Sequence, residues 1–175
     1  MELSSSLLLP TRRAALALGV GLVTGVFGSS ARAADTTIKV SLWDKGADSA
    51  MMDDAHMAMT GSMKMDMSAA MMGIKLDADS VPAGTVTFDV TNDSKDIIHE
   101  MVLSPLTADQ EDLPYLADEY KVDEDAAGHL GEVAELEPGK GGALTIDMKP
   151  GRYILYCNIP GHFVGGMWTI LTVTE

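Results

Sequence analysis

The sequence has little cysteine, few aromatic residues and little positive charge. Cys157 is the only cysteine, so no disulfide can form within the chain. Aromatic residues make up 5% of the chain, and 12 Lys and Arg stand against 26 Asp and Glu, for a formal net charge of −14. This balance excludes ordinary nucleic-acid binding, because phosphates are neutralised by Lys and Arg. It is compatible with a cationic metal or a basic protein partner.

Long hydrophobic runs are also missing, except for one near the N-terminus. Arg12 and Arg13 precede a 14-residue apolar run at 14–27, and an A-x-A motif follows at 31–33. This order predicts a signal peptide at 1–33 and an exported, periplasmic mature protein, with an uncleaved membrane anchor as the alternative. Without residues 1–33 the chain keeps 25 acidic and nine basic residues, a net charge of −16.

The rest of the chain indicates one all-β domain at 34–175. Runs that are extended or that alternate polar and apolar residues predict strands at 36–43, 74–77, 85–91, 97–103, 142–148, 152–157 and 166–174. Pro- and Gly-containing turns separate several of them, which favours a β-sandwich or barrel over βαβ units. The acidic stretch at 105–137, with eleven Asp and Glu, predicts a solvated surface and a short helix around 108–120.

One short segment carries the clearest chemistry. Cys157, His162 and Met167 are spaced C-x4-H-x4-M between two predicted strands, with Gly and Pro residues that permit tight reversals. A thiolate, two imidazoles and a weak axial thioether suit a copper ion that cycles between Cu(I) and Cu(II). Zinc sites rarely include methionine. The segment therefore predicts a mononuclear copper site that needs one further histidine.

Three histidines are candidates for that fourth ligand. His56 lies in a Met-rich segment and His129 in the acidic one, whereas His99 lies within the predicted strand 97–103. Because His99 can face the same end of a sandwich as the Cys157 loop, it is the favoured ligand. His129 has no second histidine at metal-ligand spacing and is interpreted as a surface residue.

These segments resemble the cupredoxin family, the type 1 blue copper proteins. The similar stretches are VPAGTVTFDVTN, IIHEMVL and GRYILYCNIPGHFVGGMW, and the ligand loop is similar to those of rusticyanin- and auracyanin-type members. The resemblance implies a Greek-key β-sandwich with one type 1 copper bound by His99, Cys157, His162 and Met167. It also implies that one edge of His162 is exposed through an apolar patch, for which Ile159, Pro160, Phe163 and Val164 are the candidates; the alternative is that these residues pack against the sandwich. Glu100 departs from the family, in which Asn or Ser often follows the upstream histidine.

Nine of the 13 methionines fall within 22 residues, in a predicted insert at about 44–73. The candidate ligands of a second, Cu(I) site are Met51, Met52, His56, Met57, Met59, Met63, Met65, Met67, Met71 and Met72. Thioethers bind soft Cu(I) and have no proton to lose. A flexible loop or an apolar helix surface is the alternative, although the i, i+2, i+4 spacing does not suit one helix face.

Two functions fit these features. The favoured one is a periplasmic copper protein that serves copper tolerance, with a one-electron site and a Met-rich Cu(I)-binding segment; this combination resembles copper-tolerance cupredoxins. The alternative is a plain electron carrier that docks on a basic redox partner such as a cytochrome c. An enzyme is disfavoured, because one cysteine and four histidines are too few for a multicopper oxidase.

Overall fold

The computed structural model describes residues 35–50, 63, 70–107, 109–110 and 112–175. The predicted signal peptide and most of the Met-rich segment lie outside these residues. In the described part of the chain, no helix is long and apolar enough to span a membrane.

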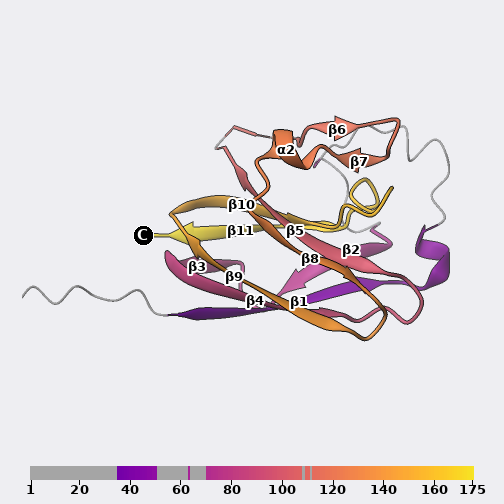
Figure 1. Ribbon diagram of the computed structural model, residues 1–175, viewed down its shortest axis with the longest axis horizontal. Helices are drawn as coiled ribbons and strands as arrows, with labels where there is room; N and C mark the ends of the chain where they lie inside the picture. Colours follow the sequence, from indigo (N-terminus) through magenta and orange to yellow (C-terminus); the bar gives the residue numbers. More distant parts are fainter. Residues whose placement is uncertain (1–34, 51–62, 64–69, 108, 111) are drawn as a thin grey trace, which may run out of the picture. The chain divides into compact units, whose positions relative to one another are not determined.

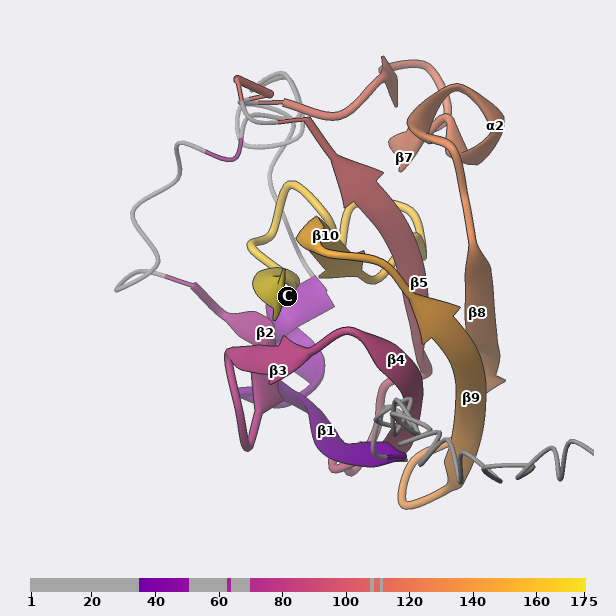
Figure 2. The same ribbon diagram turned by 90° about the vertical axis from the view of Figure 1, so that its left-hand side faces the viewer.

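The described residues form a β-sandwich, as the sequence predicts (Figures 1 and 2). The first sheet has the order β2 (Met72–Leu76), β1 (Thr36–Asp44), β4 (Gly84–Asn92) and β9 (Gly141–Met148). The second sheet has the order β3 (Ser80–Pro82), β11 (Trp168–Thr174), β10 (Gly151–Tyr156), β5 (His99–Leu106) and β8 (Gly131–Leu136). Two pairs are parallel, β1 with β4 and β3 with β11, and the other pairs are antiparallel.

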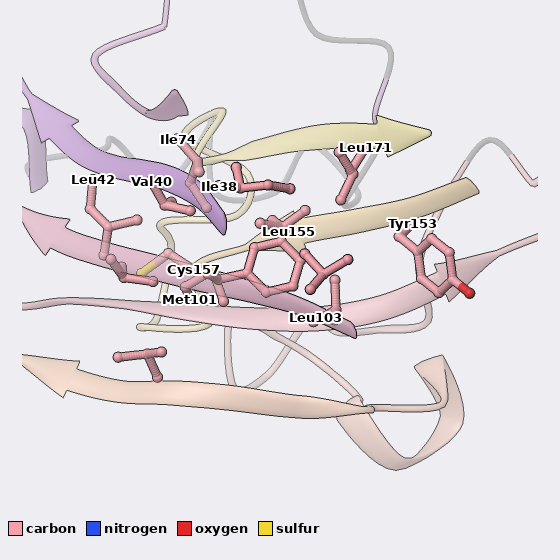
Figure 3. Close-up of a cluster of buried hydrophobic side chains, with 14 of the residues drawn as sticks. Ile38, Val40, Leu42, Ile74, Met101, Leu103, Tyr153, Leu155, Cys157 and Leu171 are labelled. Carbon is pink, nitrogen blue, oxygen red and sulfur yellow. The ribbon is translucent and has the colours of Figure 1, made fainter. Parts of the chain in front are cut away.

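The main core lies between the two sheets and follows from the alternation in the sequence. In β4, Val86, Phe88 and Val90 are fully buried while the residues between them are more exposed. Residues of all the other strands of the two sheets complete the cluster. Figure 3 shows that Cys157 lies toward the end of the cluster marked by Leu42, whereas Tyr153 and Leu171 mark the other end. The cysteine is therefore part of the core at one end of the sandwich.

A second apolar cluster covers the outer face of the second sheet. Val102, Ile154 and Tyr156 point to this side and pack with Leu113 and Val122 from the acidic segment. This explains why β5 is buried along nearly its whole length. The acidic segment is thus more than the solvated surface that its composition predicted, because its few apolar residues cover the sheet.

The acidic segment also differs from its predicted secondary structure. Instead of a helix around 108–120, it contains a two-stranded sheet, β6 (Tyr115–Leu116) and β7 (Lys121–Val122), then α2 (Glu124–Ala127) and β8. The side chain of Asp123 caps α2 by accepting the N–H of Ala126, and Gly128, with φ of 71°, ends it after one turn. The short helix is present, but later in the chain than predicted.

Candidate metal centre

The second sheet supplies all four predicted ligands. His99 is the first residue of β5, and Cys157 directly follows β10. His162 and Met167 lie in the turn between β10 and β11. Because β10 pairs with both β5 and β11, the start of β5 and the β10–β11 turn meet at the same end of the sheet.

Backbone hydrogen bonds hold the β10–β11 turn in a tight conformation. The N–H of Met167 donates to the carbonyl of His162, and the N–H of Cys157 donates to the carbonyl of Met167, each at 3.0 Å. Gly161 and Gly166 have φ of 83° and 90°, a region that side chains disfavour. The glycines that the sequence marked as permitting tight reversals therefore include two that the turn requires.

Three donor atoms converge in this turn. Nδ1 of His162 lies 3.3 Å from Sγ of Cys157 and 3.3 Å from Nδ1 of His99. One ligand atom from each of His99, Cys157 and His162 lies within 4.8 Å of the other two, and each of the three residues is buried. The two imidazoles thus turn Nδ1 toward each other, and the thiol lies beside Nδ1 of His162, so the three side chains can hold a single metal ion.

Met167, the fourth predicted ligand, lies close to Cys157 and His162 in the fold. Its side chain is fully buried in the core cluster that contains Cys157, and its backbone bonds to both Cys157 and His162. The methionine is therefore positioned by the turn that carries the other two ligands.

The protonation states of these groups suit metal binding. Burial raises the pKa of the Cys157 thiol to about 12. Burial and the neighbouring His99 lower the pKa of His162 to about 4, and burial also lowers the pKa of His99. At neutral pH the pocket thus holds a thiol and two uncharged imidazoles, and a metal ion would displace the thiol proton. A soft sulfur and two imidazoles fit copper.

Asp44 contacts a predicted ligand but was not identified from the sequence. Oδ2 of Asp44, the last residue of β1, lies 2.9 Å from Nε2 of His99, and both side chains are almost completely buried. Burial raises the pKa of Asp44, but hydrogen bonds from Ser94, His99 and the Gly46 backbone outweigh it and lower that pKa below its usual value. Asp44 and His99 are 55 residues apart, and no local motif links them.

Glu100 was singled out because it departs from the family pattern. Its backbone N–H points at Sγ of Cys157, with 3.5 Å between nitrogen and sulfur, and its Oε1 accepts the N–H of Asn158 at 3.0 Å. Burial and the nearby charges of Glu124 and Glu132 raise the pKa of Glu100 to about 7. The carboxyl group of Glu100 therefore bonds to the residue after Cys157 and does not point into solvent.

The predicted apolar patch around His162 differs from expectation. His162 is 4% exposed, and Phe163 is 1% exposed and packs edge-on against Tyr156 in the outer cluster. Of the remaining candidates for the patch, Pro160 is exposed, and Ile159 and Val164 are partly buried. Phe163 is therefore a core residue, because the second sheet has an outer cluster that the sequence did not reveal.

Few of the proposed Cu(I)-binding residues lie within the described part of the chain. Met51, Met52, His56, Met57, Met59, Met65 and Met67 lie outside the described residues. Met63 packs against the outer cluster, and Met71 is 38% exposed. Met72 belongs to β2 and is fully buried in the main core. Its observed role is packing.

His129 is near two carboxylates. Ligand atoms of Glu124, His129 and Glu132 all lie within 4.8 Å of one another, with 3.9 Å between Nε2 of His129 and Oε2 of Glu132. His129 and Glu132 are both exposed, which agrees with the interpretation of His129 as a surface residue. Sequence spacing to a second histidine did not reveal the group, because its partners are carboxylates.

Solved structures with a similar fold are copper proteins. The sequence matches no protein-family model and no curated protein. A 1.27 Å structure of rusticyanin from Thiobacillus ferrooxidans is 15% identical, with a TM-score of 0.51, and the match covers 80% of this chain and 77% of that one. Reduced auracyanin from Roseiflexus castenholzii is 21% identical over 80% of this chain and 98% of that one, with a TM-score of 0.49.

At such identities the likeness establishes the fold, and the chemistry is carried by the residues described above. The rusticyanin match and the two-sheet topology agree with the resemblance found in the sequence. The chain has the cupredoxin fold, and its His99, Cys157, His162 and Met167 form a group that fits a blue copper site.

Proposed function

We propose that this protein is an exported type 1 copper protein whose copper is bound by His99, Cys157, His162 and Met167 and exchanges single electrons. The observation that carries the proposal is the convergence of one ligand atom each from His99, Cys157 and His162 within 4.8 Å in a buried site. The group lies at one end of a fold that rusticyanin, a copper protein, shares.

The bound metal would supply a one-electron couple, Cu(II)/Cu(I). The chain supplies rigidity, because the bonds between Met167, His162 and Cys157 and the surrounding core resist movement of the ligands. It also restricts water, because all four side chains are buried. The N–H of Glu100 faces the sulfur and would stabilise negative charge on it.

Copper loading tests this proposal directly. The purified mature protein with one Cu(II) should show the intense visible band of a Cys–Cu bond and a paramagnetic resonance spectrum with narrow hyperfine splitting. Cys157→Ser should abolish both signals while leaving the fold intact by circular dichroism. A colourless wild-type protein, or a band retained in Cys157→Ser, would refute the site.

The role of Met167 has a matched control within the core. Met167→Leu should retain copper but raise the reduction potential, because a weak donor to Cu(II) is removed. Met101→Leu makes the same change at another fully buried methionine of the same cluster and should leave the potential nearly unchanged. Equal potentials in the two variants would remove Met167 from the ligand set.

We further propose that the protein serves copper tolerance in the periplasm, with extra Cu(I) bound by the methionines around 51–71. This rests on the sequence, because a plain electron carrier does not need nine methionines within 22 residues. Electron transfer without Cu(I) storage is the second candidate, and the excess of acidic residues favours a basic partner such as a cytochrome c. In both cases we propose a redox or binding role without enzymatic turnover.

A Cu(I) titration separates the two candidates. More than one Cu(I) per chain is expected for the tolerance protein. The excess should disappear when Met51, Met52, Met57, Met59, Met65 and Met67 are replaced by leucine, a change that preserves chain length and leaves Met72 in the core. A stoichiometry of one that the replacement does not alter would favour the plain carrier.

A further inference from the structure

Asp44 contacts the candidate metal centre through the imidazole of His99. We propose that Asp44 is a positioning residue that fixes the tautomer of His99 and lowers the reduction potential of the bound copper. The inference rests on the proposed function, because it concerns the same site. Its basis is the 2.9 Å contact between Oδ2 of Asp44 and Nε2 of His99, with side chains 2% and 0% exposed.

The contact determines which nitrogen of His99 carries the proton. An ionised carboxylate can only accept a hydrogen bond, so Nε2 of His99 must be the donor. In the neutral imidazole, Nδ1 then has a free lone pair. This is the atom that lies 3.3 Å from Nδ1 of His162, on the side of the ring that faces the other ligands. Asp44 therefore prepares His99 for the metal before the metal arrives.

Asp44 is itself held in place. Its Oδ1 accepts the backbone N–H of Gly46 at 2.6 Å, and the Ser94 side chain also bonds to the carboxyl group. The Ser94 hydroxyl in turn accepts the N–H of Ile97 at 2.9 Å, two residues before His99. The end of β1 and the loop before β5 are thus joined through this carboxylate, which cannot rotate away without breaking several bonds.

Charge decides the direction of the effect on the potential. Asp44 and the Cys157 thiolate contribute two negative charges, which balance Cu(II) but exceed the charge of Cu(I). In a buried site these interactions are weakly screened. A carboxylate on the far side of the imidazole also makes the ligand nitrogen more basic. Both effects stabilise Cu(II) relative to Cu(I) and lower the reduction potential.

Asp44→Asn removes the charge and keeps an oxygen that can accept from Nε2. Loss of such a partner typically weakens metal binding about 10-fold to 100-fold. Because the lost charge stabilises Cu(II) more than Cu(I), we expect this loss to fall mainly on Cu(II). The ratio of Cu(II) to Cu(I) affinity should then fall about tenfold or more, and each factor of ten raises a one-electron potential by about 59 mV. Asp93→Asn is the matched control: Asp93 lines the same surface pocket as Asp44 but is exposed and bonds to Ser41. It should change the ratio far less.

A measurement without copper keeps the inference testable if the variant folds poorly. In metal-free wild-type protein, ¹⁵N NMR of His99 should show a proton on Nε2 and a bare Nδ1. Asp44→Ala, which removes the acceptor, should give a mixture of tautomers. A proton on Nδ1 in the wild-type protein would overturn the inference.

The outcomes also separate this inference from the proposed function. A blue wild-type protein whose potential rises equally in Asp44→Asn and Asp93→Asn would reject the role of Asp44 and leave the copper site intact. A wild-type protein that never becomes blue would reject the proposed function.

Discussion

Two buried carboxylates flank His99, and their surroundings differ. Asp44 is bonded by His99, Ser94 and the Gly46 backbone, and these bonds lower its pKa. Glu100 accepts one N–H, from Asn158, and faces the like charges of Glu124 and Glu132, so its pKa rises to about 7. Burial alone would raise both pKa values. The number of donors and the sign of nearby charges decide which acid stays ionised.

The two carboxylates come from different sheets of the sandwich. The second sheet supplies the four predicted ligands and Glu100, whereas the first sheet supplies Asp44 at the end of β1. Asp44 is the permanent negative charge beside the site, and Glu100 brings its backbone N–H to Sγ of Cys157. We therefore expect substitutions at the two acids to have opposite effects on the stability of the metal-free protein.

The largest loss of stability is expected on substitution of Asn158, which bonds to Glu100 and links it to Val122 and Glu124. Its side chain accepts the N–H of Val122 at 2.7 Å and donates to the carbonyl of Val122 and to Glu124. Asn158→Ala leaves buried backbone groups of β7 without partners, which should cost about 2–4 kcal/mol of unfolding free energy. Urea unfolding of the metal-free protein measures this. A loss below about 0.5 kcal/mol would show that water replaces these bonds.

Asp44→Asn should be the next most harmful change. Hydrogen bonds to a charged group contribute about 1.5–3 kcal/mol, and the substitution weakens three of them. The pKa of Asp44 is lower in the folded protein than in the unfolded chain. The stabilisation by its carboxylate is therefore complete above the unfolded pKa, and it is lost as the pH falls through the lower, folded pKa. The loss in Asp44→Asn should therefore be constant between pH 5 and pH 8. A gain in stability would contradict the comparison.

Glu100→Gln should have the opposite sign. The folded pKa of about 7 lies above the ordinary value of 4.5, so the wild-type protein loses stability as the pH rises through that window. Glutamine keeps an oxygen for the N–H of Asn158 and removes the charge. Metal-free Glu100→Gln should gain about 1–2 kcal/mol at pH 8 and much less at pH 5, where the pH has only just passed the unfolded pKa. A gain of equal size at both pH values would show that charge is not the cause.

The sequence predicted the ligand set and the sandwich because both depend on short-range patterns. C-x4-H-x4-M places three ligands in one turn, and alternation along β4 and β9 specifies the core faces. The copper assignment itself stays a proposal that the convergence of donor atoms supports.

The parts that the sequence did not reveal depend on contacts between distant residues. Asp44 looks like a surface acid in the sequence, and only the packing of β1 against the start of β5 buries it. Among the described residues of 108–120 there is no helix; Leu113 and, just beyond this range, Val122 pack in the cluster that covers the second sheet. Strand β8 was missed because its acidic residues obscure Val133, its one fully buried position.

The smallest effect tests whether distant charge reaches Glu100. Glu132 is exposed, and on β8 it pairs with Val102 of β5, two residues beyond Glu100. Glu132→Gln should lower the pKa of Glu100 and raise stability at pH 8 by only about 0.2–0.5 kcal/mol, because solvent and salt screen exposed charges. Glu135→Gln is the control, since Glu135 lies on the same strand and is also exposed, but its charge does not contribute to the raised pKa of Glu100. If both variants moved the Glu100 titration equally in ¹³C NMR, net charge rather than the position of Glu132 would explain the raised pKa.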